Sequence, residues 1–213
     1  MCAEKESRHI HMGFIDGNYP SNTHMCLIYK SEEERRSLIE KFIFAAFQDN
    51  DRVEYFYDEW PAKEIRQSLS KYNVNVERAE ASGQIRFCQT AKAYHPTGVF
   101  NPESMWKTLC NCYDQGISDG FDGVRLSGEM TWSLKGIPGS DKLIEYESGI
   151  NNLIESHPMV VICQYDANRF DGATLMDVLR VHPYMIAQGR IVSNPYYENV
   201  SNPADFQCAA LSK

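Results

Sequence analysis

The sequence lacks both glycine-rich loops with which nucleotide-binding proteins commonly hold phosphate. Neither GxxxxGKS/T nor GxGxxG occurs in its 213 residues, and the first apolar strand runs directly into Tyr29-Lys-Ser-Glu-Glu-Glu34. In a phosphate loop, backbone N–H groups at the start of a helix point toward the anion. Three carboxylates at this helix start satisfy the helix dipole themselves and repel a nucleotide. Nucleotide hydrolysis is therefore disfavoured, although Lys30 lies where such a loop would end.

Long apolar runs, a leader sequence and an excess of positive charge are also missing. No apolar stretch approaches the ~20 residues that a membrane-spanning helix needs, and the polar N-terminus has no signal-peptide core. The formal net charge is −8 and the pI is near 5.3, whereas nucleic-acid phosphates require a basic face. We therefore expect a cytoplasmic protein whose partners include neither membrane nor nucleic acid.

The seven cysteines show no metal-binding or disulfide pattern. Their number is odd and no CxxC pair occurs, so neither a disulfide framework nor a zinc ribbon is indicated. Cys26, Cys88 and Cys163 lie in strand-like apolar runs, where a free thiol behaves as a small hydrophobe. We expect buried, reduced thiols, as in a reducing cytoplasm.

The chain shows neither an internal repeat nor a linker that would divide it. Its composition, 43% hydrophobic and 23% charged residues, is ordinary for a globular domain. Turn-forming residues and histidines at the start predict a loosely held, flexible arm over residues 1–22. Residues 23–213 are then expected to form a single domain, because this length suits one full-sized core.

Apolar periodicity alternates between strand and helix in that domain. A strand over residues 24–29 precedes a helix that Ser31 and Glu34 open as a capping box. Four further strand–helix units follow, and residues 184–192 predict one or two edge strands that turn at Gln188-Gly189. These later units have strands at 53–57, 84–89, Val124 and Val160, and helices at 61–71, 101–116, 143–154 and 171–181. Short connections of this kind predict an α/β fold, a three-layer α/β/α domain with a mostly parallel central sheet.

Two of the buried strands end in polar residues. Gly123-Val-Arg-Leu-Ser-Gly-Glu-Met-Thr-Trp132 and Met159-Val-Val-Ile-Cys-Gln-Tyr-Asp166 each pass from apolar to polar side chains. In an α/β protein, ligands bind at the carboxyl ends of parallel strands. An aromatic wall beside a carboxylate there suits a small, largely apolar molecule with one polar handle. The predicted ligand-binding residues are Arg125, Glu129, Trp132, Gln164, Tyr165 and Asp166.

Two candidate residues also have structural interpretations. Arg125 interrupts an apolar strand, and a buried arginine needs a carboxylate, for which Glu129, Glu147 or Asp166 is available. His182 lies at a predicted helix end, where it is an alternative cap. Neither GxSxG nor HExxH occurs. We therefore predict no catalytic residues and do not expect an enzyme.

A metal or redox sensor is an alternative that the histidines and cysteines raise. His24 and Cys26 are two residues apart on a strand, so both side chains point to the same face. With Cys163 on a neighbouring strand, the three would form an N/S cluster suited to zinc or iron. In the simpler interpretation, which we favour at this point, the thiols pack in the core and His24 is a hydrogen-bonded strand start.

Six motifs occur along the chain in a characteristic order: His24-x-Cys26, Tyr29-x-Ser-Glu-Glu, Gly123-x-Arg125-x-x-Gly128-Glu129-Met-x-Trp132, Tyr146-Glu147, Cys163-Gln-Tyr-Asp166 and His182-Pro183. This ordered series resembles the MEDS family, the sensory domain of methanogens, methylotrophs and the dichloromethane-responsive repressor. The resemblance implies a fold similar to that of the RecA/KaiC ATPases with the Walker motifs lost, and a single MEDS-like domain over residues 23–213. It also implies a sensory role in prokaryotic signalling, with a simple hydrocarbon derivative such as methanol or a chlorinated methane as ligand.

The same resemblance suggests how the domain communicates. Such domains commonly accompany kinase, helix-turn-helix or sigma-regulator modules, so a signalling partner such as a kinase or a transcription regulator is expected. The alternative is a protein-interaction module, in which a degenerate RecA-like core only docks a partner or forms a homodimer. RecA-like relatives assemble through sheet edges and neighbouring helices, and the Tyr196-Tyr197 segment is a candidate contact surface.

Overall fold

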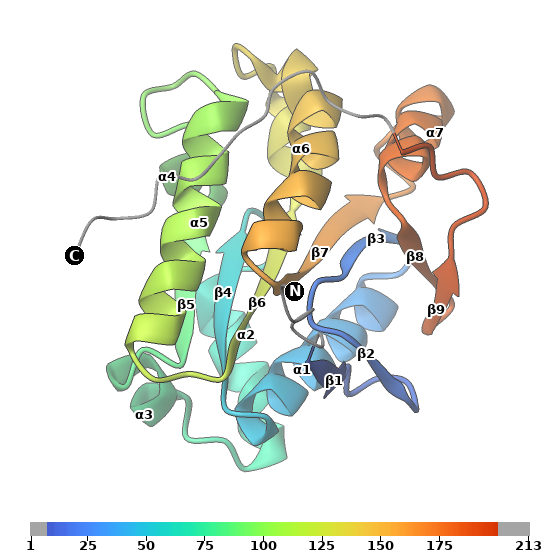
Figure 1. Ribbon diagram of the computed structural model, residues 1–213. Coiled ribbons are helices and arrows are strands. Elements are labelled where there is room, and N and C mark those ends of the chain that lie inside the picture. The colour runs from blue at the N-terminus through green and yellow to red at the C-terminus, as the bar shows by residue number, and fades with distance from the viewer. Residues whose placement is uncertain (1–7, 200–213) are drawn as a thin grey trace, which may run out of the picture.

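The structure of the protein is a computed structural model that describes residues 8–199. It is organised around a seven-stranded sheet with the strand order β5-β4-β6-β7-β3-β8-β9 (Figure 1). All neighbouring strands are parallel apart from β8 and β9. The strands are β3 (His24–Tyr29), β4 (Asp51–Tyr57), β5 (Ile85–Gln89), β6 (Gly123–Glu129), β7 (Met159–Asp166), β8 (Tyr184–Ala187) and β9 (Arg190–Ser193).

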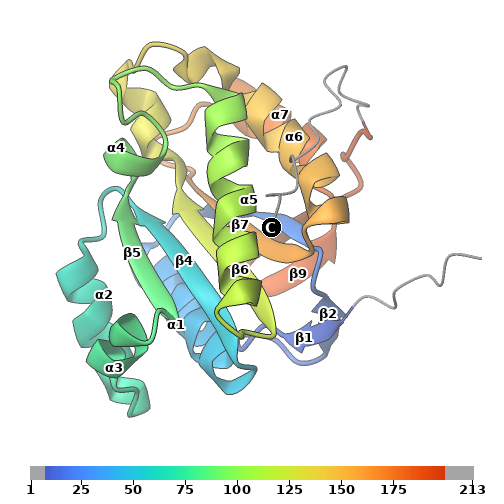
Figure 2. The same cartoon turned by 60° about the vertical axis from the view of Figure 1, so that its left-hand side comes forward.

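Helices cover both faces of this sheet. Figure 2 shows α1 (Glu32–Gln48) behind β4, whereas α5 (Pro102–Ser118) lies in front of β6. The remaining helical elements are α2 (Ala62–Leu69), η1 (Ser70–Tyr72), α3 (Val76–Ala81), α4 (Thr90–Ala93), η2 (Met130–Lys135), η3 (Ser140–Lys142), α6 (Leu143–Ser156) and α7 (Gly172–Val181). This arrangement confirms the predicted three-layer α/β/α fold. None of the helices in residues 8–199 is long and apolar enough to cross a membrane.

Short polar side chains set the starts of the main helices. The side chains of Ser31, Asn101 and Asp171 each accept a hydrogen bond from the backbone N–H three residues later, at 3.3, 2.8 and 2.7 Å. Each bond satisfies a donor that the first helical turn leaves unpaired. The turn between β8 and β9 is the predicted one, because Gln188 and Gly189 have positive φ angles of 50° and 70°.

The sheet separates two hydrophobic cores. α1 and α2 pack on one face of the strands, where Phe42 and Ile65 are completely buried. α5 and α6 pack on the other face, where Trp106 and Ile150 are almost completely buried. Because successive side chains of a strand point to opposite faces, each strand contributes alternately to the two cores. The same alternation decides where the polar side chains of the strands go.

Residues 8–22 correct the flexible arm that the sequence predicts over 1–22. They form an antiparallel hairpin, β1 (His9–His11) and β2 (Asn18–Pro20), that packs against the core beneath α1. Ile10 is 3% exposed and Met12 is completely buried. These two apolar residues, two apart, anchor the hairpin among turn formers and histidines. Residues 1–7 lie outside the described part of the chain.

Arg125 fastens this hairpin to the sheet. Its Nε donates to Asp51 Oδ2 at 2.7 Å, its Nη1 donates to the carbonyl oxygen of His11 at 2.8 Å, and its Nη2 pairs with Asp49. Arg8 also pairs with Asp51. All of these partners lie at the amino ends of β4 and β6 or on the hairpin.

The structure therefore places Arg125 away from the carboxyl end of β6, where the sequence analysis expected it to anchor a ligand. The structural alternative, in which Arg125 forms a buried ion pair, is correct. Its partners are Asp49 and Asp51, however, and not one of the three carboxylates considered from sequence. β4 runs beside β6 with Val53 opposite Arg125, and this register brings the aspartates before and at the start of β4 to the guanidinium. The carboxylates considered from sequence lie elsewhere because strand order is not visible in a single sequence.

We expect Arg125→Ala to release the hairpin and destabilise the protein by about 3–5 kcal/mol, because it leaves buried Asp51 without its main cation. Amide hydrogen exchange should accelerate over residues 9–20, and the urea midpoint should fall. Arg180→Ala, which removes an exposed ion pair with Glu198, is the matched control and should leave both nearly unchanged. Equal behaviour of the two variants would contradict the role given to Arg125.

Candidate functional site

The pleat of the sheet divides the predicted pocket residues between its two faces. β6 and β7 are neighbours, and Glu129 lies opposite Gln164. Successive side chains alternate, so Gln164 points toward α1, where Arg35 binds it, and Tyr165 points toward α6, where Glu147 binds it. The structure thus gathers these side chains into two buried clusters, one on each face.

The arginine cluster comprises Arg35, Tyr55, Ser127, Glu129 and Gln164, all buried beneath α1. Arg35 Nη1 lies 3.2 Å from Glu129 Oε1 and donates to Gln164 Oε1 at 3.0 Å. The Tyr55 hydroxyl donates to Glu129 Oε1 at 2.9 Å. Gln164 Nε2 donates to Ser127 Oγ at 2.9 Å and to the Tyr55 hydroxyl at 3.2 Å. The five side chains therefore form one connected hydrogen-bond network.

The second oxygen of Glu129 is held by the backbone. Glu129 Oε2 accepts hydrogen bonds from the N–H groups of Asp58, Glu59 and Trp60 at 3.0, 2.6 and 3.2 Å. Successive N–H groups of this kind form a cradle for an anion, and here the anion is the protein's own carboxylate. Glu129 has no oxygen left for an external ligand, so we interpret it as the structural centre of this end of the sheet.

Arg35 is a buried, charged member of the arginine cluster that was not predicted from sequence. It lies in the first turn of α1, and only Lys30 and Ser31 separate that helix from β3. Its guanidinium turns inward to Glu129 and also donates to Glu32 at 2.5 Å. A connection of two residues is shorter than a phosphate loop, and this ion pair fills the space beneath it. The only available sequence signal was an arginine three residues after the first acidic residue of the helix.

Trp132 and Asp166, the two remaining predicted ligand contacts, lie in different surroundings. Trp132 is completely buried within an aromatic group, with ring centroids 4.6 Å from Phe100 and 4.9 Å from Tyr94. Its Nε1 has no hydrogen-bond partner among the described residues. Asp166 Oδ1 accepts from the backbone N–H of Asn168 at 2.8 Å and shapes the turn after β7. Neither side chain lines either of the two open cavities described below.

The histidine cluster comprises His24, Glu147, Cys163, Tyr165 and His182, on the opposite face of the sheet. Glu147 Oε2 lies at its centre, 3.2 Å from His24 Nε2, 3.4 Å from His182 Nε2 and 3.1 Å from Cys163 Sγ. The Tyr165 hydroxyl donates to the other oxygen, Glu147 Oε1, at 2.5 Å. The side chains of the two histidines and Glu147 are completely shielded from solvent.

Four elements of the fold bring these residues together. His24 begins β3, and Cys163 lies on the adjacent strand β7. Glu147 reaches down from α6, and His182 is the residue that ends α7. His182 Nδ1 contacts the carbonyl oxygen of Val178 at 2.7 Å, which confirms its predicted role as a cap of that helix. The same side chain also belongs to the cluster.

Burial controls the charges in the histidine cluster. Burial and the neighbouring His182 lower the pKa of His24, which favours its neutral form. Burial and the charge of Glu147 raise the pKa of Cys163 well above its usual value. Burial would also raise the pKa of Glu147, but the adjacent rings of His182 and His24 outweigh it and hold that pKa far below its usual value. Glu147 therefore carries the negative charge at the centre.

The metal alternative from sequence named His24, Cys26 and Cys163. Two of the three lie in the histidine cluster, but Cys26 does not, because its Sγ faces the carbonyl oxygen of Tyr184 at 3.8 Å. Burial and the charge of Glu147 raise the pKa of the Cys26 thiol to about 12. Glu147 and His182 were missing from that set, since their sequence positions give no sign that α6 and α7 converge on β3.

Of the five cysteines within residues 8–199, four are free thiols, as predicted. Cys26 and Cys163 are buried, and Cys88 and Cys112 are half-buried. Cys110 is an exception, because it takes part in a disulfide bond. The prediction of reduced thiols is therefore wrong for that residue.

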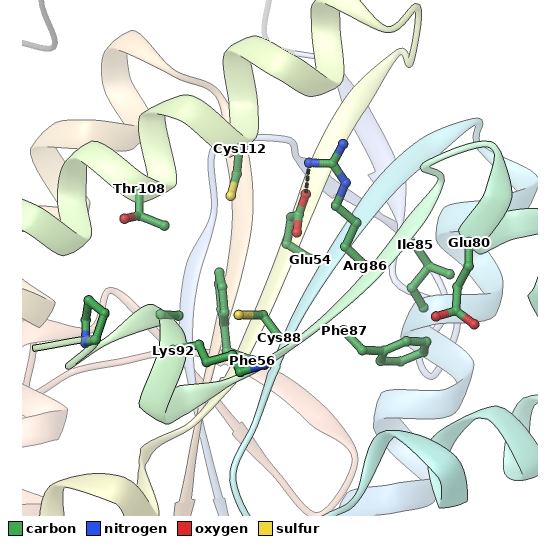
Figure 3. A pocket seen from close by; sticks show the side chains of 12 residues that line it. Glu54, Phe56, Glu80, Ile85, Arg86, Phe87, Cys88, Lys92, Thr108 and Cys112 are labelled. Atoms are coloured by element: carbon green, nitrogen blue, oxygen red, sulfur yellow. Dashed lines mark ion pairs between the residues drawn. The ribbon is translucent and has the colours of Figure 1, made fainter. Parts of the chain in front are cut away.

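An open cavity of about 520 Å³ lies at the sheet edge formed by β5. Figure 3 shows the side chains of Thr108 and Cys112 extending from α5 on the side where Phe56 and Cys88 rise from the strands. We call it the edge cavity. Its other lining residues are Glu54, Glu80, Ile85, Arg86, Phe87, Lys92, Ala93 and Pro96. None of the residues predicted as ligand contacts lines this cavity.

A second hollow of about 510 Å³ lies between α1 and α2. Charged and amide side chains make up most of its wall, including Arg36, Glu40, Glu64 and Gln67, with Trp60 as the aromatic member. This lining suits water and ions more than an apolar molecule. The edge cavity is the better match to a ligand with a hydrocarbon part.

Solved structures show which class of fold this is. A KaiC-like protein of the archaeon Pyrococcus horikoshii superposes with a TM-score of 0.60 at 14% sequence identity, over 84% of this chain and 79% of that one. The flagellar accessory protein FlaH of Methanocaldococcus jannaschii superposes with a TM-score of 0.58 at 12% identity, over 87% and 84%. The fold is therefore RecA/KaiC-like, as predicted.

Within that class, the family is also clear. The model of the MEDS family, the methanogen/methylotroph, DcmR sensory domain, matches residues 23–183, and the chain belongs to this family. The transcriptional repressor DcmR of Methylorubrum extorquens is 26% identical over 161 residues, which is 75% of this chain. The matched segment spans 57% of the length of that repressor. A sensory role in signal transduction follows from the family.

We expect Glu129→Ala to destabilise the protein by about 3–5 kcal/mol, because it leaves the buried guanidinium of Arg35 and three backbone N–H groups unpaired. Glu64→Ala, which removes an exposed pair with Arg36, is the control and should cost up to ~1 kcal/mol. Chemical denaturation followed by circular dichroism measures both. A Glu129→Ala protein as stable as the control would mean that the arginine cluster does not hold this end of the sheet.

Proposed function

We propose that this chain is a non-catalytic sensory domain that binds a small hydrocarbon derivative in the edge cavity. The observation that carries the sensory role is the match of the MEDS family over residues 23–183. The observation that supports the location is the edge cavity itself, whose volume of about 520 Å³ lies in the range of small-molecule sites.

The side chains predicted from sequence are less suitable contacts. Glu129, Gln164 and Tyr165 are already hydrogen-bonded inside the two clusters. A ligand that entered either cluster would have to replace those bonds and would leave buried polar groups unpaired, at a cost of about 1–3 kcal/mol for each. The edge cavity is open, so a ligand need displace only solvent there.

The lining of the edge cavity suggests the chemistry of its ligand. Phe56, Ala93 and the thiol of Cys88 offer an apolar wall, and Thr108 offers a hydroxyl on the opposing helix. Lys92 adds a cation at the same site. We propose a ligand whose hydrocarbon part lies on the wall and whose single polar group reaches Thr108 or Lys92. This is the ligand class that the family resemblance implies, placed at a different part of the fold.

We further propose that the signal passes to a transcription regulator. The similarity to a transcriptional repressor supports this, and the matched segment covers little more than half of that repressor. The net charge of −8 makes direct binding of nucleic acid by this chain unfavourable. A separate DNA-binding module or partner protein would therefore read the signal.

The test is a thermal-stability screen of the protein against methanol, methylamines, small halocarbons, short-chain alcohols and short carboxylates. A ligand at a hundredfold excess over its dissociation constant stabilises the folded state by about 2.7 kcal/mol. Ala93→Leu should abolish the shift, because the larger side chain fills the cavity. Ala91→Leu is the matched control on the same helix, since Ala91 is exposed and does not line the cavity.

Two results would overturn the proposal. A flat response of the folded wild-type protein to the whole panel would contradict binding of this ligand class. A shift that survives in Ala93→Leu, with the Ala91→Leu protein behaving as wild type, would place the ligand elsewhere.

A further inference from the structure

Four side chains of the histidine cluster that can donate an electron pair to a metal lie close together in the interior. The ligand atoms of His24, Glu147, Cys163 and His182 all lie within 4.8 Å of one another, and all four residues are buried. Every one of these atoms is a recognised metal ligand. Nothing in the proposed ligand binding at the edge cavity uses this cluster, which lies on β3, β7, α6 and α7.

The hydrogen-bond partners of Nδ1 fix the tautomers of both histidine rings. His182 Nδ1 faces the carbonyl oxygen of Val178 at 2.7 Å, and a carbonyl only accepts, so Nδ1 must carry the hydrogen. His24 Nδ1 faces Asn151 Oδ1 at 3.0 Å. The orientation of that amide is set by its other end, because Asn151 Nδ2 donates to the carbonyl oxygen of Val181 at 2.8 Å. His24 Nδ1 therefore also carries its hydrogen.

When both rings are neutral, these tautomers leave the two nitrogens that face Glu147, His24 Nε2 and His182 Nε2, without a hydrogen and with a lone pair each. His24 Nε2 and His182 Nε2 then point at Glu147 Oε2, which itself only accepts, from 3.2 and 3.4 Å. Lone pairs this close repel one another unless positive charge lies between them. Protonating both rings would place two cations with ring centroids 4.2 Å apart in a site closed to solvent, which burial opposes.

Protonating His24 alone leaves His182 unsatisfied, and protonating His182 alone leaves His24 Nε2 only the weak thiol donor of Cys163 at 3.6 Å. His182 Nε2 is buried and makes no hydrogen bond within the described residues, although it lies close to the carboxylate. Buried polar atoms in native proteins are nearly always satisfied, and each exception calls for an explanation such as an ion. A single divalent cation would satisfy both nitrogens, the carboxylate and the sulfur together.

We propose that His24, Glu147, Cys163 and His182 bind one divalent transition-metal ion of the zinc class in a tetrahedral site. Zinc bound to nitrogen and oxygen at about 2.0–2.1 Å and to sulfur at about 2.3 Å gives ligand–ligand separations of roughly 3.3–3.6 Å. The measured contacts of Glu147 Oε2 are 3.1–3.4 Å, and Cys163 Sγ lies 3.6 Å from His24 Nε2. The other pairs of ligand atoms lie within 4.8 Å, so side-chain rotations that draw the wider pairs together would complete the site.

The proposed ligand side chains are held by hydrogen-bond partners of the kind that metal sites commonly use. Metal-bound histidines usually donate their other N–H to a carbonyl, amide or carboxylate, which fixes the ring. Asn151 and the carbonyl of Val178 do this here, and the Tyr165 hydroxyl holds the far oxygen of Glu147. The thiol would bind as a thiolate and release its proton when the metal enters.

Such a site would fasten α6 and the end of α7 to the adjacent strands β3 and β7. All four positions of the tetrahedron are filled by the protein, which is the pattern of a structural metal rather than a catalytic one. Because the ligands are closed to solvent, the metal is expected to enter during folding. Removal of the metal should lower the thermal midpoint.

The test begins with protein produced without chelators and analysed for bound metal. The expected result is one zinc-class ion per chain. Protein refolded with Co²⁺ should show the intense visible bands of a tetrahedral cobalt site and a thiolate-to-cobalt charge-transfer band in the near ultraviolet. Folded wild-type protein with neither stoichiometric metal nor these bands would overturn the proposal and leave a proton-sharing cluster.

Variants assign the ligands. Cys163→Ser should lose the charge-transfer band, and His182→Asn should lose most of the bound metal. Cys88→Ser and His157→Asn are matched controls outside the cluster and should keep both signals. Loss of the band in Cys88→Ser but not in Cys163→Ser would overturn the assignment. If a cluster variant does not fold, the cobalt spectrum of the wild-type protein still decides the question.

Discussion

Two carboxylates, Glu129 and Glu147, are buried on opposite faces of one sheet, and the interior must neutralise each of them. A carboxylate that loses its hydration costs several kcal/mol unless charges and hydrogen bonds replace the water. Arg35 and three backbone N–H groups do this for Glu129. The rings of His24 and His182 surround Glu147. The first requirement ties α1 to the end of the sheet, and the second ties α6 and α7 to β3 and β7.

These two solutions explain how a RecA/KaiC-like fold is used without a phosphate loop. The space between β3 and α1 is short and is filled by the ion pair of Arg35 with Glu129. The edge cavity beside β5 remains open. In the proposed sensor, the closed end gives rigidity and the open edge receives the ligand.

The sequence was sufficient for the strands of the main sheet and for the layers because periodicity, caps and turns are local properties, but it missed the hairpin at residues 8–22. It was insufficient for the site, because strand order and helix packing are not local. β7 lies beside β3, which brings Cys163 to His24, and α6 crosses above them with Glu147. The single pocket expected from sequence is divided because Gln164 and Tyr165 point to opposite faces. Arg35 has no local signal that it turns inward.

In the proposed site, a metal shared with two histidines and a thiolate balances the charge of Glu147. X-ray absorption at the edge of the bound metal tests this most directly, because it counts the ligand atoms and their distances. The account predicts one sulfur at about 2.3 Å and three nitrogen or oxygen atoms at about 2.0–2.1 Å. A six-coordinate shell of oxygen atoms without sulfur would contradict it.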